Sequence, residues 1–446
     1  MEAARAADPA AGLDVDKLTY EIFSILESKF LFGYDDPKLF SAGASPQPPG
    51  TAKATPLRSP TTPSGNKAKV CILSIDGGGR AADGLLAGAA LVRLEASLRR
   101  RTGDDGARLA DFFDVAAGSG AGGVLAAMLV ARGPHGRPLF SADDALAFLL
   151  RSLRRGGGGG WSDAGGGGGV LRALFRRPGG GGGGPAFRKL FGDLTLRDTV
   201  RPVLVPCYDL ATGGPFLFSR ADAVETRAYD FRLLDVCAAT CAGAAAASAA
   251  AVEARSCDGS TRIAAVGGGV ALGNPTAAAI THVLNNKREF PLAAGVEDLL
   301  VVSIGSGETR GAAASTSEIV RIAAEGVADM VDQAVAMAFG HNRTSNYIRI
   351  QATGTPRAKG SGCGGVAEEM LAQKNVESVL FRGKKVAEQT NAEKLERFAH
   401  ELVKERDRRR NSPVSPTAVK QRPSGGEPTP PASYSNLVSH MLTSIM

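Results

Sequence analysis

A glycine-rich turn between an apolar strand and an apolar helix is the segment of this chain best suited to chemistry. Gly118, Gly120 and Gly122 keep the G-x-S-x-G spacing of a nucleophile elbow, in which a sharp turn presents a serine to an acyl carbon. Gly120 occupies the serine position, so the turn predicts an acyl-transfer scaffold without its usual attacking atom. Ser119 is a weak substitute, because neighbouring side chains on a sharp turn point in different directions; the alternative is a small residue that fills the turn.

A second glycine cluster follows the apolar run at residues 70–75. Gly77, Gly78 and Gly79 come directly after Asp76 and precede a helix. Successive glycines let backbone N–H groups converge on an anion, and the positive end of the helix dipole favours negative charge there. An oxyanion hole and a phosphate cradle both fit this loop. A nucleotide-binding module is the weaker alternative, because no G-x-x-x-x-G-K-[ST] pattern is present.

A third segment, residues 266–275, reads Val-Gly-Gly-Gly-Val-Ala-Leu-Gly-Asn-Pro and leads into an expected helix at 276–284. Proline suits the start of a helix. Asp258 lies nearby in an Asp-Gly pair, which favours a hairpin turn over a catalytic role. Ser306 is expected in a loop, and His282 on the helix is interpreted as structural. The other four histidines lie outside the three segments and receive no role.

Strands alternate with helices along the chain, which predicts an α/β fold with a mainly parallel sheet covered on both faces. The expected elements are strands at 70–75, 112–117, 203–209, 299–304 and 347–351, and helices at 85–101, 124–131, 276–284, 319–339 and 391–408. In such a sheet the loops after the strands meet at one edge, so the glycine segments are expected to lie together.

The segments flanking and interrupting this domain have different compositions. Residues 1–40 contain an amphipathic helix at 13–32, which is either docked on the main domain or a free interaction element; docking is favoured because its apolar face needs a cover. A linker rich in Pro and Ser follows at 41–67, and the main domain is expected at 68–405. Its glycine-rich insertion at 156–184 is either a solvated loop or a basic, hydrophobic loop that touches a membrane. The tail at 406–446 is expected to be disordered.

Charge and cysteine content limit the environment. The chain has 446 residues, a formal net charge of +7 and six cysteines without a C-x-x-C pair or metal-ligand spacing. These features predict a reduced, cytoplasmic protein without a metal or other cofactor. The positive charge suits a negative surface, although flexible basic segments would produce it as well. The N-terminus has no secretory signal, and the apolar residues 236–252 are too few to span a bilayer.

The order and spacing of the three glycine segments resemble the patatin-like phospholipase family. In that family the Asp-Gly-Gly-Gly loop is the oxyanion hole, the elbow serine is the nucleophile, and an aspartate in the third segment is the base. Residues 20–23, 347–351 and 374–381 further resemble the third class of plant patatin-related phospholipases A, which carries glycine at the nucleophile position. The resemblance implies a patatin-like three-layer fold, a central mainly parallel sheet flanked by helices.

Transferred residue by residue, the resemblance assigns Gly77, Gly78 and Gly79 to the oxyanion hole. It assigns Gly120 to the nucleophile position, where serine is absent, and Gly267 to the base position, where aspartate is absent. Relative to the family, the first loop is two residues longer, and Asp83 stands where a basic residue is usual.

The functional expectation is therefore a lipid acyl hydrolase of weak or unconventional mechanism. Its expected ligands are membrane glycerolipids, such as phospholipids or galactolipids, reached by peripheral membrane contact and without nucleic acid. The alternative is a catalytically inactive lipid-binding pseudoenzyme.

Overall fold

The computed structural model describes residues 68–155, 185–242, 251–307, 316–353, 363–379, 383–411 and 417. They all belong to one of the two units into which the chain divides, Ser64–Met446. The expected helix at 13–32, the linker at 41–67 and the insertion at 156–184 lie outside the described residues, as does most of the tail.

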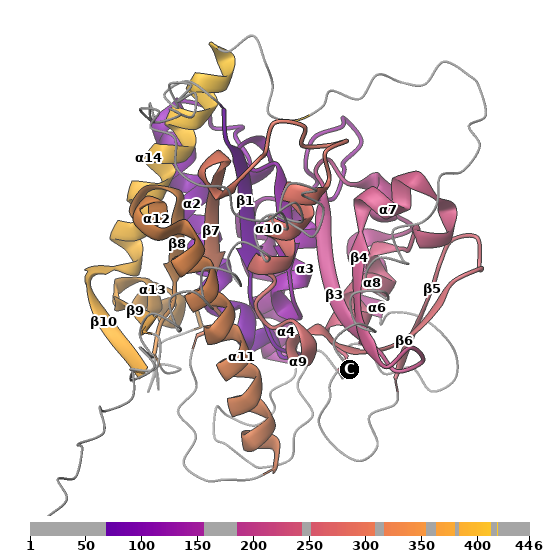
Figure 1. Cartoon of the computed structure of the whole chain (residues 1–446). Helices are drawn as coiled ribbons and strands as arrows, with labels where there is room; N and C mark the ends of the chain where they lie inside the picture. Colours follow the sequence, from indigo (N-terminus) through magenta and orange to yellow (C-terminus); the bar gives the residue numbers. More distant parts are fainter. Residues whose placement is uncertain are drawn as a thin grey trace, which may run out of the picture. The chain divides into compact units, whose positions relative to one another are not determined.

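A mixed sheet with a parallel centre forms the middle layer (Figure 1). Its order is β5-β6-β3-β2-β1-β7-β8. The eighth strand, β4, lies off this path and pairs with β3. Strands β3, β2, β1, β7 and β8 run parallel, whereas β4, β5 and β6 are antiparallel additions at one side. The strands are β1 (Val70–Ile75), β2 (Val115–Gly118), β3 (Val203–Asp209), β4 (Gly214–Ser219), β5 (Val252–Arg255), β6 (Arg262–Gly267), β7 (Leu299–Ile304) and β8 (Tyr347–Ile350). Strands β9 (Lys374–Val379) and β10 (Gly383–Thr390) form a separate antiparallel pair.

Helices cover both faces of this sheet, because alternate residues of the buried strands point to opposite sides. Leu73 and Ile75 pack in a core shared with α2, α3, α4 and α14, whereas Val70 and Ile72 pack in a second core shared with α10 and α11. The helices are α2 (Leu85–Thr102), α3 (Ala121–Val130), α4 (Ala142–Arg155), α6 (Pro185–Phe191), α7 (Arg220–Glu225), α8 (Leu233–Thr240), α9 (Gly268–Ala271), α10 (Thr276–Asn285), α11 (Thr316–Phe339), α12 (Arg343–Asn346), α13 (Cys363–Ala372) and α14 (Asn391–Arg410). The predicted α/β class with helices on both faces is confirmed.

Agreement with the predicted elements is closest for the buried parallel strands. The strands expected at 70–75, 203–209 and 299–304 have those bounds in the structure. β2 begins three residues later than expected, at Val115, because a 3₁₀ turn at Leu109–Asp111 precedes it. α14 continues to Arg410, five residues into the segment expected as tail, and Arg409 pairs there with Asp114 at 3.0 Å.

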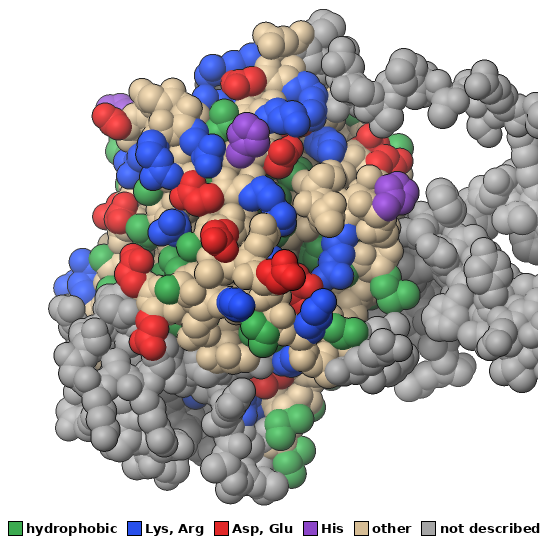
Figure 2. Space-filling view, turned by 90° about the vertical axis from the view of Figure 1, so that its left-hand side faces the viewer, with side chains coloured by type: hydrophobic (Ala, Val, Ile, Leu, Met, Phe, Trp, Pro, Cys, Tyr) green, Lys and Arg blue, Asp and Glu red, His purple; other side chains and the backbone are tan. Residues whose placement is uncertain are grey.

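The surface of this unit is polar over most of the face seen in Figure 2, where side chains of both charges are interspersed. Among the described helices, none combines the length and the apolar character that crossing a membrane requires.

Candidate functional site

The three glycine segments meet at the carboxyl ends of β1, β2 and β6. A Cβ atom built on Gly77 would lie 2.5 Å from the Ser119 carbonyl oxygen, and one built on Gly269 would lie 2.9 Å from the Gly77 carbonyl oxygen. These approaches exclude side chains at both positions. The first loop is therefore pressed against the elbow on one side and against the third segment on the other.

The turn at Gly120 has the backbone conformation of a nucleophile elbow. Gly120 has φ 53° and ψ −125° and immediately precedes α3, a helix that is buried along its whole length. A positive φ strains any residue with a side chain, and elbow enzymes accept this strain at the nucleophile. Gly118 and Gly122 permit close packing: their Cβ atoms would lie 2.5 Å from the Gly122 carbonyl carbon and 2.6 Å from the Asp76 carbonyl oxygen.

The first loop fills the space that a serine side chain at the elbow would need. A Cβ on Gly120 would lie 2.7 Å from the Gly78 carbonyl carbon and closer still to its oxygen. That oxygen accepts a hydrogen bond of 2.9 Å from the Ala121 N–H. In elbow enzymes the N–H after the nucleophile is an oxyanion donor. In this structure the Gly78 carbonyl oxygen already accepts the hydrogen bond that the Ala121 N–H would donate to an oxyanion.

Gly267, to which the resemblance assigns the base position, is the last residue of β6. Its Cβ would lie 3.2 Å from the Thr240 carbonyl oxygen and would collide with the Ala242 carbonyl oxygen. Sequence reasoning missed Thr240, which is fully buried and lies between the two dyad positions. Its Oγ1 accepts a 2.8 Å hydrogen bond from the Gly120 N–H and would lie 2.9 Å from a Cβ on Gly268. Its place within the apolar stretch at 236–252 carried no sequence signal for this role.

Ser119 is directed into the protein. It is 0% exposed, and its hydroxyl oxygen is buried without a hydrogen-bond partner. A nucleophile must meet its substrate and give up its proton to a base, and Ser119 has neither opportunity in this conformation.

The weaker candidates lie apart from the elbow. Asp258 occupies the turn between β5 and β6, where it accepts hydrogen bonds from Ser256 and Ser260. Ser306 follows β7 in a loop and is half-buried. His282 lies on α10, where burial lowers its pKa to about 4. Among the described residues, no group of three or more His, Cys, Asp and Glu side chains is arranged to hold a metal ion.

The lengthened part of the first loop forms a 3₁₀ turn at Ala81–Gly84. Asp83 accepts hydrogen bonds from the Arg80 backbone N–H at 3.1 Å and from the Arg80 guanidinium at 2.7 Å. The Asp83 carboxylate thereby lies beside Gly78, where a built Cβ would be 3.2 Å from its Cγ. A carboxylate there opposes the accumulation of negative charge on a reacting oxygen, and Arg80 counteracts part of this effect.

A buried polar group, named here the anchor cluster, lies behind the first loop and consists of Asp76, Arg349, Ser303, Thr276 and Ser74. Arg349 of β8 pairs with Asp76 at 2.5 Å, and each side chain is 4% exposed. Arg349 also donates to Ser303 at 2.7 Å, and Thr276 donates to Ser74 at 2.8 Å. Burial raises the pKa of Asp76 to about 6, and the nearby guanidinium counteracts this rise.

Sequence reasoning also missed the role of Arg349. A charged residue within an apolar strand was the available signal, because arginine is almost never buried without a partner.

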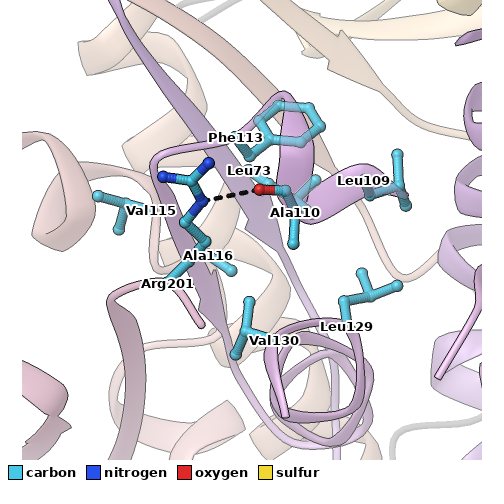
Figure 3. A pocket seen from close by; sticks show the side chains of 9 residues that line it. All are labelled: Leu73, Leu109, Ala110, Phe113, Val115, Ala116, Leu129, Val130 and Arg201. Carbon is cyan, nitrogen blue, oxygen red and sulfur yellow. Dashed lines mark hydrogen bonds between the residues drawn. The ribbon is translucent and has the colours of Figure 1, made fainter. Parts of the chain in front are cut away.

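Two cavities lie near the amino-terminal ends of β2 and β3, away from the elbow. One is a void of about 10 Å³ bounded by Leu73, Phe113, Leu129 and other apolar side chains. Figure 3 shows these side chains and, beside them, Arg201, which donates to the Ala110 carbonyl at 2.7 Å. A larger cavity of about 440 Å³ adjoins Arg201 and Phe290. Neither is lined by residues of the three glycine segments, so neither adds room for a substrate at the elbow.

Comparison with known proteins gives close relatives in plants. Patatin-like protein 3 of Oryza sativa subsp. indica is 62% identical over 416 residues, which cover 90% of this chain and 94% of the relative. Patatin-like protein 7 of Arabidopsis thaliana is 50% identical, covering 91% of this chain and 84% of the relative. "Probable inactive patatin-like protein 9" of Arabidopsis thaliana is 39% identical, covering 88% and 93%.

No family model matches the chain. The crystal structure of VipD from Legionella pneumophila aligns over 76% of this chain and 67% of that one, with 11% identity and a TM-score of 0.27, which supports no further argument. The identities to the plant proteins over most of both chains are decisive by themselves, and this chain belongs to the patatin-like protein family.

Proposed function

We propose that this protein is a lipid acyl hydrolase of low turnover that acts on polar glycerolipids. The observation that carries the proposal is the elbow itself: Gly120 keeps φ 53° and ψ −125° at the start of a buried helix, beside a triple-glycine loop. Membership of the patatin-like family supports an ester of a polar lipid as the substrate. The assignments of Gly77, Gly78 and Gly79 to the oxyanion hole remain part of this proposal.

The missing side chains limit the rate. Loss of a serine nucleophile costs about 10⁶ in kcat in a serine protease, and an oxyanion hole with binding alone retains roughly 10³–10⁴ over the uncatalysed reaction. With glycine at 120 and 267, a water molecule must attack the ester carbonyl carbon. The protein then contributes only substrate binding and the electrostatic effect of its backbone N–H groups.

Hydrolysis further requires the first loop to open. The Ala121 N–H is bonded to the Gly78 carbonyl at 2.9 Å, so it can stabilise an oxyanion only after this bond is broken. A lipid ester that offers its own carbonyl oxygen to Ala121 would replace the interaction at little net cost.

Fatty acid release from vesicles of mixed phospholipid and galactolipid tests the proposal. We expect slow release by the purified chain, a loss of at least about tenfold in Gly78→Val, which blocks the loop, and little change in Ser119→Ala, whose hydroxyl is enclosed. Thermal unfolding controls for folding. Equal release by all three proteins would assign the activity to a contaminant.

One observation favours a second function, lipid binding without turnover. The Gly78 carbonyl accepts the Ala121 N–H and thereby blocks the oxyanion donor at the elbow. Both predicted dyad positions, 120 and 267, are glycine. This function predicts vesicle binding that weakens with salt and forms no product. Saturable turnover that Gly78→Val abolishes would exclude it.

Restoring the dyad measures how firmly the elbow is closed. In Gly120→Ser/Gly267→Asp both new side chains meet backbone atoms, those of Gly78 and Ala242. A large gain in fatty acid release would therefore show that the loop opens. A folded double variant without a gain would show that it stays shut.

A further inference from the structure

Helix α11 presents an apolar surface to solvent. Every exposed residue between positions 319 and 337 is apolar or glycine. Among the exposed large hydrophobic residues of the described chain, six of nine belong to this helix, with exposures from 45% for Val320 to 57% for Ile322. We name this surface the outer face of α11; it comprises Ile319, Val320, Ile322, Ala323, Gly326, Val327, Met330, Ala334 and Met337.

The charged residues between positions 319 and 337 of α11 are not part of this face. Arg321 and Glu325 pair with each other at 2.5 Å and are 21% and 33% exposed. Asp329 pairs with Lys384 of β10 at 3.1 Å, and Asp332 is buried and accepts a 2.5 Å hydrogen bond from the Tyr347 hydroxyl. A surface helix of a soluble domain normally shows the reverse pattern, with its charges toward water. An apolar stripe of this extent indicates a binding surface.

Helix α11 packs beside the third glycine segment through residues outside its outer face. Asn274, which follows the third segment, donates to the Ala328 carbonyl at 3.1 Å, and α11 contacts α9. The pKa of Arg80 in the first loop is raised mainly by Asp83; Arg321 of α11 lowers it and Glu325 raises it to smaller extents. Figure 1 shows the amino-terminal end of α11 reaching past α9, and hydrophobic side chains project at the lower tip of the view in Figure 2.

The composition of the face favours lipid over a protein partner. Its large side chains are Ile, Val and Met, without the Trp, Tyr or Arg that dominate binding at protein interfaces. Acyl chains need only apolar area, which these side chains supply along roughly 27 Å of helix. Lys384 pairs with Asp329 of α11, Lys385 next to it is exposed, and the net charge of +7 attracts the chain to anionic lipid.

We propose that the outer face of α11 docks this protein on a lipid bilayer and sets the elbow at the membrane surface. The inference rests on the proposed function for its choice of partner. Docked in this way, the helix lies in the interface with its apolar face among the acyl chains, as monotopic helices do. The first loop then faces the headgroups, where the ester bonds of glycerolipids lie.

Co-sedimentation of the full chain with vesicles of phosphatidylcholine and phosphatidylglycerol tests the docking. Ile322→Glu and Met330→Glu place a charge where acyl chains would be, and we expect each to weaken binding at least about tenfold. The matched control is Leu139→Glu, because Leu139 is also an exposed hydrophobic residue, at 40%, but follows the far end of α3 from the elbow. Its binding should stay within about twofold of the parent.

Two further measurements separate this inference from the proposed function and from self-association. If the parent hydrolyses lipid but both α11 variants bind vesicles normally, the docking inference is overturned and the hydrolase proposal survives. If neither the parent nor any variant hydrolyses lipid but vesicle binding falls only in the α11 variants, the docking inference is supported and the hydrolase proposal fails. Sedimentation velocity decides the remaining case: a dimer that Met330→Glu dissociates, with vesicle binding unchanged, would assign the face to a second copy.

Discussion

The elbow and the anchor cluster lie at neighbouring strand ends, yet they are held by opposite means. At the elbow, backbone meets backbone: Gly118, Gly120 and Gly122 each touch main-chain atoms where a side chain would have to fit. In the anchor cluster, side chains do the holding, through the 2.5 Å pair of Asp76 with Arg349 and the hydroxyls around it.

This difference between the elbow and the anchor cluster shows where the site lacks side chains and where it keeps them. Gly120 and Gly267, the predicted dyad positions, have no side chains, whereas Asp76 and Arg349 behind the first loop are both present and paired. Positioning and chemistry are therefore separable in this protein. Each prediction below perturbs one side of the comparison, starting with the largest expected effect.

Removing Arg349 should damage the anchor cluster most. In Arg349→Met the Asp76 carboxylate stays buried without its partner, which should lower the free energy of unfolding by about 3–5 kcal/mol. Chemical denaturation measures this. The double variant Asp76→Asn/Arg349→Met removes both charges and should recover part of the loss; a single variant as stable as the parent would contradict this account.

The anchor cluster should also respond to pH, whereas the elbow holds no titratable side chain at its glycines. The pKa of Asp76 is about 6 in the folded protein, above its ordinary value of 3.8. The folded state therefore binds more protons between these values, and the stability contributed by neutral Asp76 is complete below pH 3.8 and lost as pH rises through 6. Measured against Asp76→Asn, so that the titration of all other groups cancels, the parent should lose about 3 kcal/mol of unfolding free energy between pH 3 and pH 7. A constant difference would show that the pair titrates outside this window.

On the elbow side, a single methyl group should be costly. In Gly122→Ala the new Cβ lies 2.6 Å from the Asp76 carbonyl oxygen, and the backbone must move; we expect a loss of about 3 kcal/mol in the free energy of unfolding. Gly326→Ala is the matched control, because a Cβ there meets nothing within 4 Å. That change should stabilise α11 by about 0.5–1 kcal/mol. Equal effects at the two glycines would refute close packing at the elbow.

In the described part of the chain, the Thr240 side chain supports the elbow backbone by accepting a hydrogen bond from the Gly120 N–H. Thr240→Val keeps the shape but leaves the buried Gly120 N–H without an acceptor, at a cost of about 1–2 kcal/mol. Faster hydrogen exchange at the Gly120 amide should accompany the loss. Unchanged exchange there would mean that other groups hold the turn.

The local sequence pattern was sufficient to predict the bounds of strands that are buried on both faces. Strands β1, β3 and β7 are apolar runs buried on both faces, so their bounds could be predicted from composition alone. The antiparallel β4 and β6 are only partly buried, their apolar runs are only three and four residues long, and they were not predicted. The roles of the glycines at 77–79, 120 and 267 stay predictions, as do the domain bounds.

Spacing along the chain was enough to recognise the family and to predict a tight turn at Gly120, because a strand, a turn and a helix are encoded within a few neighbouring residues. Three properties came only from the folded chain: the Gly78 carbonyl on the Ala121 amide, the pairing of Asp76 with Arg349, and the outward apolar face of α11. Each depends on which segments, distant in sequence, pack against one another. Periodicity can assign α11 an apolar face, but whether that face meets the core or the solvent is decided by the partners of its charged residues, Lys384 and Tyr347, on strands formed later in the chain.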